Sequence, residues 1–286
     1  MIKRLAIIGV GLIGGSLSLA LKKAGVVEEV VGFSRTDSAR DEALKLGVID
    51  RAANSIANAV KDADVVFLAV PMAAMESVLS ELSEHISSDA IITDGGSAKA
   101  QVVDVARKAL GNKFSQFVPG HPIAGTEKSG PSAAFAELYQ NHRVVLTPVA
   151  ETNTAALEKV RTMWQRAGAE VFDMNVEHHD DVLAATSHLP HILAFNLVGM
   201  LAKRDDCDEV LRYAAGGFKD FSRIASSDAV MWRDICLTNK DAILELLEEY
   251  QSGLSQLQQA IEKQDGETLK TVFERAKQAR DTRFKD

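Results

Sequence analysis

The sequence is poor in cysteine, in proline and in aromatic residues. Its 286 residues include two cysteines and six prolines, and 6% of them are aromatic. Cys207 and Cys236 stand far apart, without a CxxC motif or a cluster of other metal ligands beside them. This pattern excludes a disulfide framework and a structural zinc knuckle. The scarcity of cysteine favours a reducing compartment, so we expect a cytoplasmic protein.

The sequence also lacks an excess of positive charge and a long apolar run. Lys and Arg number 32 against 40 Asp and Glu, and the net charge of −8 argues against nucleic acid or an anionic membrane as the main partner. No segment reaches the roughly 18–20 apolar residues of a membrane span. The most apolar stretch, residues 191–202, is short and carries a histidine and an asparagine, so we expect a buried helix. Residues 1–10 form an apolar stretch only as long as a strand, without the cleavage site of a signal peptide.

The composition that remains is that of an ordinary globular protein. Hydrophobic residues make up 46% of the chain and charged residues 25%. At roughly 150 residues per domain, the length corresponds to about two domains with a sizeable core.

The first half of the chain alternates short apolar runs with helical patterns. The predicted strands are Leu5–Val10, Val30–Phe33, Val65–Val70 and Ile91–Thr93, and shorter β-like runs follow at Phe114–Val118, Arg143–Pro148 and Glu170–Asp173. The predicted helices are Ser16–Lys23, Ser38–Leu46, Met75–His85 and Lys99–Leu110. Nearly unbroken apolar strands that alternate with helices are typical of a parallel, doubly wound α/β sheet.

From about Val176 onward the pattern is helical, with breaks near 204–208 and 214–217. The segment Asp241–Lys263 is amphipathic, and one of its faces carries Leu244, Leu247, Leu254, Leu257 and Ile261. We therefore predict a dinucleotide-binding domain over residues 1–175. We predict an all-α domain over residues 176–286.

A glycine-rich motif, Gly-x-Gly-x-x-Gly, connects the first predicted strand to the first helix. Its glycines are Gly9, Gly11 and Gly14, and Leu12 and Ile13 stand between the last two. Directly after a strand and at the start of a helix, these glycines permit a tight turn, close approach of a diphosphate and close helix–strand packing. We expect these five residues to bind a dinucleotide, with Val70 and Pro71, after the third predicted strand, beside it.

The end of the second predicted strand bears on the choice between NAD and NADP. Enzymes that use NAD usually carry Asp or Glu about 20 residues after the glycine motif, to accept from the ribose 2′-hydroxyl. Here the chain has Ser34, Arg35 and Thr36 instead. Because a hydroxyl and a guanidinium can hold a 2′-phosphate, we expect NADP. The alternative is that Arg35 is a solvated turn residue that stacks on adenine, which leaves NAD usable.

Three polar segments follow predicted strands or open a helix. The first, residues 93–99 (TDGGSAK), contains Asp94 and Ser97, which are either site residues or helix N-caps. The second, residues 119–131, places His121 between glycine and proline on a loop, which is typical of a site group rather than a surface histidine. The third, residues 186–191 (TSHLPH), opens a predicted helix capped by Thr186 or Ser187. Its two histidines have no third ligand at a matching spacing, so we expect no metal.

Cations in the otherwise acidic helical half suggest a site for a carboxylate. They stand in residues 216–224 (GGFKDFSRI) and 231–234 (MWRD). Arginine holds a carboxylate through two parallel hydrogen bonds, and Arg223 follows a Gly-Gly pair. A surface ion pair is the alternative for each arginine.

Taken together, these motifs resemble those of the prephenate/arogenate dehydrogenase family of tyrosine biosynthesis. The resemblance extends from Lys3 to about Ile235 and is carried by GVGLIGGSL, DGGSAK, PGHPIAGTEKSG, TSHLPH and GGFKDFSRIASSDAVMW. It implies oxidative decarboxylation of a cyclohexadienol, a small dicarboxylate, to a phenol with hydride transfer to a nicotinamide. It also implies a homodimer formed through the helical domain. Because the FSR segment resembles the NADP-using branch, NADP with arogenate is the expected pair, with prephenate and NAD left open.

The resemblance further implies roles for individual residues. His121 matches the histidine that accepts a hydrogen bond from the C4 hydroxyl, and Ser97 matches the serine that orients it. Arg223 matches the arginine that holds a substrate carboxylate. The remaining substrate-binding positions are Thr126, Glu127, Ser187, His191 and Trp232, the last of which could come from a second subunit.

Two other classes of protein share parts of this pattern. β-Hydroxyacid dehydrogenases have the same layout, but they generally use a lysine of the helical domain that no motif here presents. A regulatory protein that senses NADP without catalysis needs no histidine, serine and arginine at the edge of the sheet.

Overall fold

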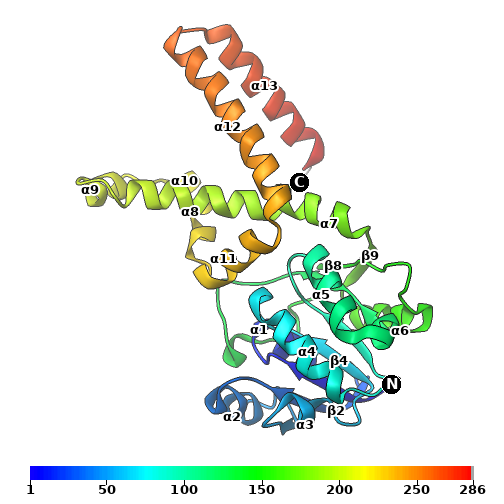
Figure 1. Cartoon of the computed structure of the whole chain (residues 1–286). Coiled ribbons are helices and arrows are strands. Elements are labelled where there is room, and N and C mark those ends of the chain that lie inside the picture. Colours follow the sequence, from blue (N-terminus) through cyan, green and yellow to red (C-terminus); the bar gives the residue numbers. More distant parts are fainter. Residues whose placement is uncertain (285–286) are drawn as a thin grey trace. The chain divides into compact units, whose positions relative to one another are not determined.

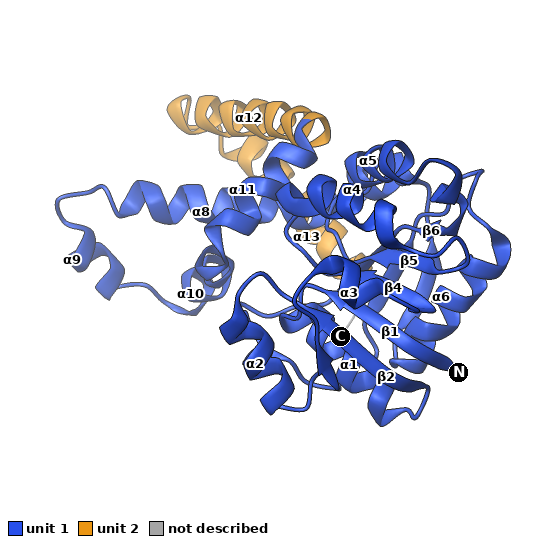
Figure 2. Cartoon of the chain, turned by 60° about the horizontal axis from the view of Figure 1, so that its bottom comes forward, with its two compact units in different colours: residues 1–240 blue, residues 241–286 orange. Residues whose placement is uncertain are grey.

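The structure, a computed structural model, describes residues 1–284 (Figure 1). Contacts divide the chain into two compact units, Met1–Lys240 and Asp241–Asp286, shown in different colours in Figure 2. Within the first unit we distinguish a sheet region, residues 1–175, from a helical region, residues 176–240.

The sheet region is built on six parallel strands in the order β3-β2-β1-β4-β5-β6. They are β1 (Ile2–Ile8), β2 (Val27–Phe33), β3 (Arg51–Ala52), β4 (Val65–Leu68), β5 (Ile91–Asp94) and β6 (Phe117–Val118). This order is that of doubly wound dinucleotide-binding folds, in which ligands bind at the carboxyl ends of the strands near the switch point. The predicted fold class, a Rossmann-type domain followed by a helical one, is confirmed.

Helices cover both faces of this sheet. They are α1 (Leu12–Lys23), α2 (Asp37–Lys45), α3 (Ile56–Val60), α4 (Met75–His85), α5 (Ala100–Leu110) and α6 (Thr154–Arg166), with short 3-10 turns η1 (Met72–Ala74), η2 (Gly111–Gln116) and η3 (Pro131–Ala133). Alternate residues of each strand belong to two different apolar clusters, because successive side chains of a strand point to opposite faces. One cluster includes α3, α4 and α5, and the other includes α1 and α6.

The predicted strands of the first half lie within a few residues of the observed ones. The largest difference is at the start, where β1 spans Ile2–Ile8 rather than Leu5–Val10. The strand ends early because Gly9 has a φ of 97°, which turns the chain out of the sheet.

A second, three-stranded sheet corrects the prediction that residues 119–131 are a loop. Its strands are β7 (Gly120–Ile123), β8 (Arg143–Leu146) and β9 (Glu170–Asp173), in the order β7-β8-β9. His121 pairs with Val145, and Pro122 with Val144, in an antiparallel ladder. The sequence predicted a loop here because glycine and proline, which usually mark loops, stand near the start of this strand. The consequence is that His121 lies on a strand.

The helical region contains a nearly continuous helix followed by shorter ones. Its elements are α7 (Val176–Leu183), the π-helical segment η4 (Ala184–His188), α8 (Leu189–Leu201), α9 (Cys207–Arg212), α10 (Gly216–Ser222), the 3-10 turn η5 (Arg223–Ser226) and α11 (Ala229–Thr238). The predicted helix start with Thr186 or Ser187 as N-cap is wrong, because α7, η4 and α8 follow one another directly. Instead of capping a helix, the Thr186 hydroxyl donates to the Val182 carbonyl.

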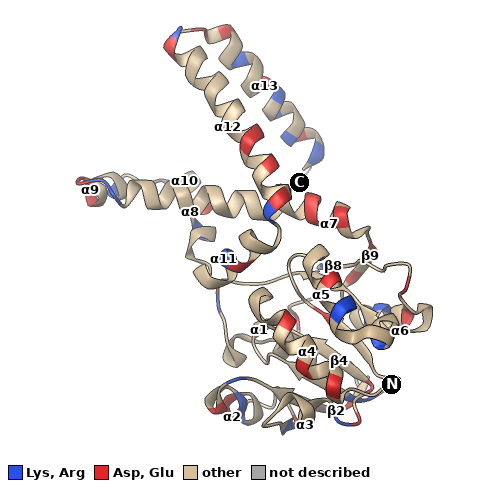
Figure 3. Cartoon of the chain, in the orientation of Figure 1, with Lys and Arg blue, Asp and Glu red and all other residues tan. Residues whose placement is uncertain are grey.

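The apolar helix α8 differs from expectation in its exposure. Among its residues only Ala194 is buried, and Met200 is 55% exposed, although the sequence predicted a buried helix. Figure 3 shows α8 free of charged side chains. The helical run Val176–Leu201 is long and apolar enough to cross a membrane by length and composition alone, with a mean hydropathy of 1.3 in its best window. Such a helix is weak evidence for a membrane span, and it leaves an uncovered apolar surface to be explained.

The second unit consists of two helices, α12 (Lys240–Glu262) and α13 (Gly266–Arg283). Asp265 caps α13 by accepting from the Thr268 N–H at 3.0 Å. The amphipathic helix predicted at Asp241–Lys263 is confirmed within one residue at each end. Three residues of its predicted apolar face are exposed: Leu244, Leu254 and Ile261.

Candidate active site

The glycine motif forms a cradle between β1 and α1. A Cβ on Gly9 would lie 2.3 Å from the Ala69 carbonyl oxygen, and one on Gly14 would lie 2.4 Å from the Gly9 carbonyl oxygen. A Cβ on Gly11, in contrast, would meet nothing within 4 Å. Helix α1 begins at Leu12 with no side-chain cap, so its first N–H groups, including that of Ile13, have no partner within the helix. Open space above unpaired N–H groups fits a diphosphate.

After the end of β2, one cationic side chain beside this cradle has no partner among the described residues. The Ser34 hydroxyl accepts from the Val10 N–H at 3.0 Å, and the Thr36 hydroxyl caps α2. Arg35 is exposed, and within the described residues it forms no hydrogen bond or ion pair. Arg40, which the sequence analysis did not single out, donates to the Ser34 carbonyl and pairs with Asp37. Of the three predicted residues, Arg35 is therefore the one free to bind a phosphate.

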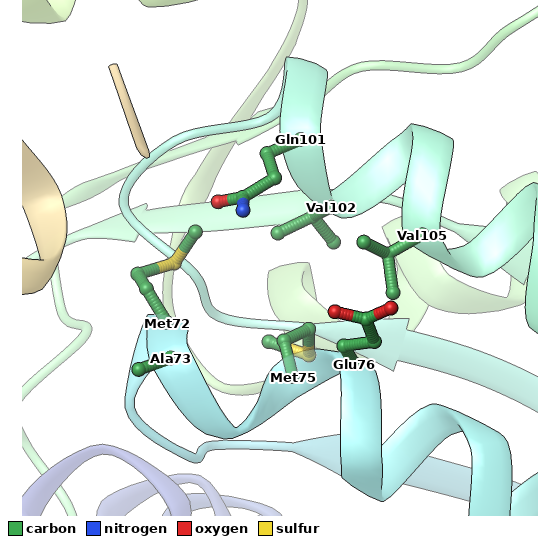
Figure 4. Close-up of a pocket in the computed structure, with 7 residues that line it drawn as sticks. All are labelled: Met72, Ala73, Met75, Glu76, Gln101, Val102 and Val105. Carbon is green, nitrogen blue, oxygen red and sulfur yellow. The ribbon is translucent and has the colours of Figure 1, made fainter. Parts of the chain in front are cut away.

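Val70 and Pro71 continue the chain after β4. A Cβ on Gly9 would lie 3.2 Å from Val70 Cγ1, so Val70 adjoins the glycine motif, and Pro71 is exposed ahead of η1. Figure 4 shows a nearby pocket lined by Met72, Ala73, Met75, Glu76, Gln101, Val102 and Val105. Its volume of about 40 Å³ is far below the roughly 300 Å³ or more of a typical ligand pocket, so it is not a candidate site for the dinucleotide or the substrate.

Asp94 and Lys99 form a buried ion pair where β5 ends. Both side chains are fully buried, and the Lys99 ammonium also donates to the Gly120 carbonyl at 2.8 Å. Asp94 accepts from the Gly96 and Gly120 N–H groups at 2.8 and 3.1 Å. Asp94 is thus not a helix N-cap. It fixes the first residue of β7 against the end of β5, which places His121 at the carboxyl edge of the parallel sheet.

His121 is buried, and another histidine holds one of its ring nitrogens. Its Nδ1 lies 2.9 Å from Nε2 of His179, which belongs to α7. Ser97, the predicted orienting residue, is half-buried three residues after Asp94, and its hydroxyl makes no hydrogen bond among the residues described. Because His179 occupies Nδ1, only Nε2 of His121 is open to Ser97 or to a substrate.

Asp180 completes the chain of contacts that starts at His121. Its Oδ1 lies 2.8 Å from Nδ1 of His179 and accepts the Lys99 N–H at 2.7 Å. Its Oδ2 accepts the Ala100 N–H at 2.9 Å. Helix α5 is therefore capped by a carboxylate from 80 residues away, and neither Asp94 nor Ser97 is its cap.

Burial and neighbouring charges shift the pKa values of these groups. Burial lowers the pKa of His121 well below its usual value, and the charges of His179, Lys99 and His188 lower it further. Burial also lowers the pKa of His179, against the opposing hydrogen bond to Asp180. For Asp180, burial raises the pKa, but hydrogen bonds from His179 and from the start of α5 outweigh it and lower the pKa. Both histidines are thus neutral, and Asp180 is ionised, near neutral pH.

A second group of polar side chains lies on the helical region. Burial lowers the pKa of His188 to about 4, and its Nδ1 lies 3.1 Å from the amide nitrogen of Asn239. His191 donates from Nδ1 to the Ser187 carbonyl at 2.9 Å and stacks on Trp232, with 3.6 Å between ring centroids. The Trp232 indole N–H is buried without a partner in the part of the chain that is described. The structure thus brings His191 and Trp232 together within one chain.

The predicted carboxylate-binding arginine faces an acidic residue of the sheet region. Arg223 Nη1 lies 3.8 Å from Glu127 Oε2, and both side chains are largely exposed. Thr126, next to Glu127, accepts from the Lys128 N–H through its hydroxyl. Arg223 and Glu127, 96 positions apart, are thereby neighbours, although the distance is too long for a hydrogen bond.

His179 and Asp180 were not predicted from the sequence. They stand in the run His178-His179-Asp180-Asp181, which has the composition of an exposed helix face. The only local hint is Asn175, which caps α7 just before them. In residues 1–284, no group of three or more His, Cys, Asp or Glu side chains is arranged to hold a metal ion.

Comparisons with known proteins cover almost the whole chain. Residues 17–173 match the family model described as prephenate dehydrogenase, nucleotide-binding domain. Residues 175–275 match the model described as prephenate dehydrogenase, dimerization domain. The chain is 40% identical to the cyclohexadienyl dehydrogenase of Zymomonas mobilis, over 97% of this chain and 95% of that protein. It is 41% identical to the prephenate dehydrogenase of Bacillus subtilis, over 96% of this chain and 74% of that protein.

Solved structures give the same picture. Prephenate dehydrogenase from Aquifex aeolicus, in complex with hydroxyphenyl propionate and NAD+, superimposes with a TM-score of 0.91 at 37% identity, covering 98% of both chains. Synechocystis arogenate dehydrogenase gives a TM-score of 0.81 at 28% identity, covering 98% of this chain and 100% of that one. A 3-hydroxyisobutyrate dehydrogenase from Mycobacterium tuberculosis, at 16% identity and a TM-score of 0.51, shares the fold only.

Proposed function

Because this chain belongs to the prephenate dehydrogenase family of NAD(P)-dependent oxidoreductases, we propose that it oxidises and decarboxylates arogenate or prephenate, with hydride transfer to NADP. The products are tyrosine from arogenate and 4-hydroxyphenylpyruvate from prephenate. The observation that carries the proposal is the position of His121: buried, neutral and at the carboxyl edge of the sheet that also carries the glycine cradle.

The reaction places simple demands on the protein. The hydride on C4 of the ring needs an acceptor, which the nicotinamide of a dinucleotide held through its diphosphate at Gly9–Gly14 would supply. The C4 hydroxyl needs a base, and the neutral Nε2 of His121 accepts its proton. Loss of the C1 carboxylate as CO₂ then needs no further residue, because it leaves an aromatic ring.

The substrate carries two carboxylates, and the helical region supplies a cation for one. Arg223 is exposed and has only a long contact to Glu127, so its guanidinium is available for a bidentate pair. Trp232, whose buried indole N–H has no partner among the described residues, stacks on His191 in the same region. We assign Thr126, Glu127, Ser187 and Ser97 to the same site on the family resemblance.

For the cofactor we propose NADP, with NAD as the alternative. The support is the absence of a carboxylate at residue 34 and the free guanidinium of Arg35. An Arg35→Ala variant is expected to bind NADP about tenfold more weakly, with NAD little changed, since one charge-assisted hydrogen bond is lost. Equal losses for the two dinucleotides, in fluorescence titrations of each, would remove the basis for this assignment.

We also propose that the protein is a cytoplasmic homodimer. The support is the uncovered apolar surface of α8, together with the match of residues 175–275 to a dimerization-domain model. A second copy of the chain is the occupant that fits, because α8 carries no charge to attract an acidic or basic partner. We retain the domain boundary at 175/176 as part of this proposal.

The experiment that tests the proposed function is a two-by-two assay. Prephenate and arogenate are each combined with NAD and with NADP, and reduced nicotinamide and CO₂ are measured. Activity in the NADP column with release of CO₂ is the expected result. Activity only with NAD contradicts the cofactor assignment, and reduction without CO₂ favours a hydroxyacid dehydrogenase. Silence in all four combinations contradicts the proposed reaction.

A further inference from the structure

Three buried side chains form an unbroken line into the protein from the proposed reaction site. His121 lies on β7, and His179 and Asp180 lie on α7, 58 and 59 positions later. The exposed fractions of the three side chains are small: His121 is 9% exposed, His179 is fully buried and Asp180 is 5% exposed. No local sequence pattern connects these three residues. Any catalytic role for the line rests on the proposed function.

The hydrogen bonds among these three side chains determine which ring nitrogens of His121 and His179 carry a proton. Ionised Asp180 has only acceptors, so Nδ1 of His179 must carry the proton that it shares with Oδ1. A neutral imidazole has one N–H, so Nε2 of His179 is then an acceptor. Nδ1 of His121 must therefore donate to it across 2.9 Å. It follows that Nε2 of His121 bears a lone pair, as a base at that position requires.

We propose that His179 and Asp180 are positioning residues that hold His121 in the Nδ1–H tautomer and stabilise the positive charge it gains in the reaction. The free imidazole in water has no such constraint. In the folded protein, the tautomer is set by a carboxylate two hydrogen bonds away. The arrangement has the logic of a catalytic triad, with a second histidine inserted between the base and the acid.

The proton balance of the step is simple. As C4–H leaves with its electron pair for the nicotinamide, the hydroxyl proton moves to Nε2 of His121, and C4–O becomes a carbonyl. The C1–CO₂⁻ bond then breaks, and its electron pair enters the ring and generates a phenolate. The proton on His121 returns to that oxygen as the phenol forms. While His121 is protonated, it donates from Nδ1 to His179, and His179 donates from Nδ1 to Asp180. The negative charge of Asp180 therefore stabilises the positive charge on His121 through two hydrogen bonds.

The surrounding charges explain why such support is needed. Burial and the Lys99 ammonium both disfavour a positive charge on His121. Lys99 is itself paired with Asp94, and its ammonium also donates to the Gly120 carbonyl. Asp180 is the carboxylate connected to His121 through hydrogen bonds, so its charge is the one that can be shared along the line.

Adjacent residues supply matched controls for a test. His178 and Asp181 are exposed on the same helix as their buried namesakes His179 and Asp180. His179→Leu removes the acceptor for His121, whereas in His179→Gln an amide oxygen can still accept from Nδ1–H. Neither leucine nor glutamine can take up a proton as an imidazole can, so in both variants the positive charge on His121 is no longer shared with Asp180. The controls are His178→Leu and His178→Gln, and Asp181→Asn serves as the control for Asp180→Asn.

The first readout is kinetic. We expect His179→Leu to lower kcat about a hundredfold and His179→Gln about tenfold, with KM within about twofold, because general-base help is worth about 10²–10⁴-fold and these residues do not touch substrate. Asp180→Asn is expected to lower kcat with KM unchanged. A His179→Leu kcat equal to that of His178→Leu overturns the proposal. So does a loss that lies in KM rather than in kcat.

The second readout needs no turnover and separates this inference from the proposed function. In ring-nitrogen NMR spectra of the substrate-free protein, His121 is expected as the Nδ1–H tautomer in the wild type and in His179→Gln. In His179→Leu it is expected to lose this preference. If His121 is the Nε2–H tautomer in the wild type, its Nδ1 does not donate to His179, and the proposal is wrong. If the wild type reduces no cofactor with either substrate, the proposed function is wrong, and the spectra still decide the tautomer.

Folding is checked separately, since Asp180 also caps α5. Each variant is compared with its control by thermal unfolding and by dinucleotide binding. His179→Gln serves where His179→Leu is unstable, because its hydrogen bond to His121 is retained. A folded, cofactor-binding His179→Gln with wild-type kcat and pH profile contradicts charge sharing through Asp180.

Discussion

The sheet region and the helical region of the first unit differ in how completely the rest of the chain buries their apolar side chains. In the sheet region, strands such as β4 and β5 are buried along their whole length by helices on both faces. In the helical region, a helix as apolar as α8 has a single buried residue. Both carry apolar sequences, so the difference lies in what covers them. The chain itself covers the apolar strands of the first region, and we propose that a second copy of the chain covers α8 in the other.

The proposed site is divided in the same way. The sheet region supplies the base His121 and the cofactor cradle, all close to buried structure. The helical region supplies Arg223 and Trp232, which we propose bind the substrate, and also His179 and Asp180, which we propose position the base. Changes at the base and its positioning residues should therefore lower kcat, whereas changes at the binding residues should raise KM.

The largest effect is expected for His121→Asn. Removal of the base should lower kcat by about 10²–10⁴-fold and change KM little, since its contribution lies in the transition state. His142→Asn, an exposed histidine of the same region, is the control. Steady-state rates of cofactor reduction measure the effect. A large rise in KM with kcat retained would assign His121 to substrate binding. His121 and Arg223 would then affect the same kinetic constant.

Arg223→Ala is expected to act in the opposite way. A charge-assisted carboxylate pair contributes about 1.5–3 kcal/mol, which corresponds to a rise in KM of roughly ten- to a hundredfold with kcat nearly unchanged. Arg212→Ala, an exposed arginine of α9, provides the comparison. Since the substrate is held in ground and transition states alike, loss of kcat at constant KM contradicts the role proposed for Arg223.

The coverage of α8 is tested by a pair of equally exposed residues. Met200 on α8 is 55% exposed, and Leu46, after α2 in the sheet region, is 50% exposed. Met200→Glu should weaken the dimer by roughly tenfold or more, because a charge is buried in an apolar interface, whereas Leu46→Glu should not. Sedimentation equilibrium distinguishes the 30.9 kDa chain from its dimer. A wild-type chain that is monomeric throughout removes the explanation for the exposed helix.

A separate effect, on stability rather than on activity or assembly, is expected at mildly acid pH. His121, His179 and His188 have lowered pKa values in the folded protein, so the unfolded chain binds more protons below pH about 6.5 and stability falls there. Each histidine contributes a slope of about 1.4 kcal/mol per pH unit, which for His188 ends near its folded pKa of about 4. Thermal unfolding between pH 7 and pH 5 measures the slope. His188→Gln should reduce it, and an unchanged slope would show that His188 is not protonated on unfolding.

Much of the sheet region was predictable from local patterns. Apolar runs identified most strands, and the glycines at 9, 11 and 14 identified the cradle. A tight turn and close packing require glycine at positions 9 and 14, and position 11 leaves open space for a diphosphate. The strand at His121 was not predictable, since Gly120 and Pro122 are typical of loops and only the ladder with β8 makes them a strand. The capping of α5 was not predictable either, because Asp180 replaces the local candidates.

By itself the sequence determined the order of most strands and helices and the position of the glycine cradle, and it predicted His121 as a site residue, because each depends on neighbours within a few residues. The tertiary structure decided what surrounds that histidine. His179 and Asp180 look like a solvated helix face until α7 packs against the start of α5. Burial then removes water as their partner, so each polar atom must find another, and the atoms available are those of His121 and of the α5 backbone.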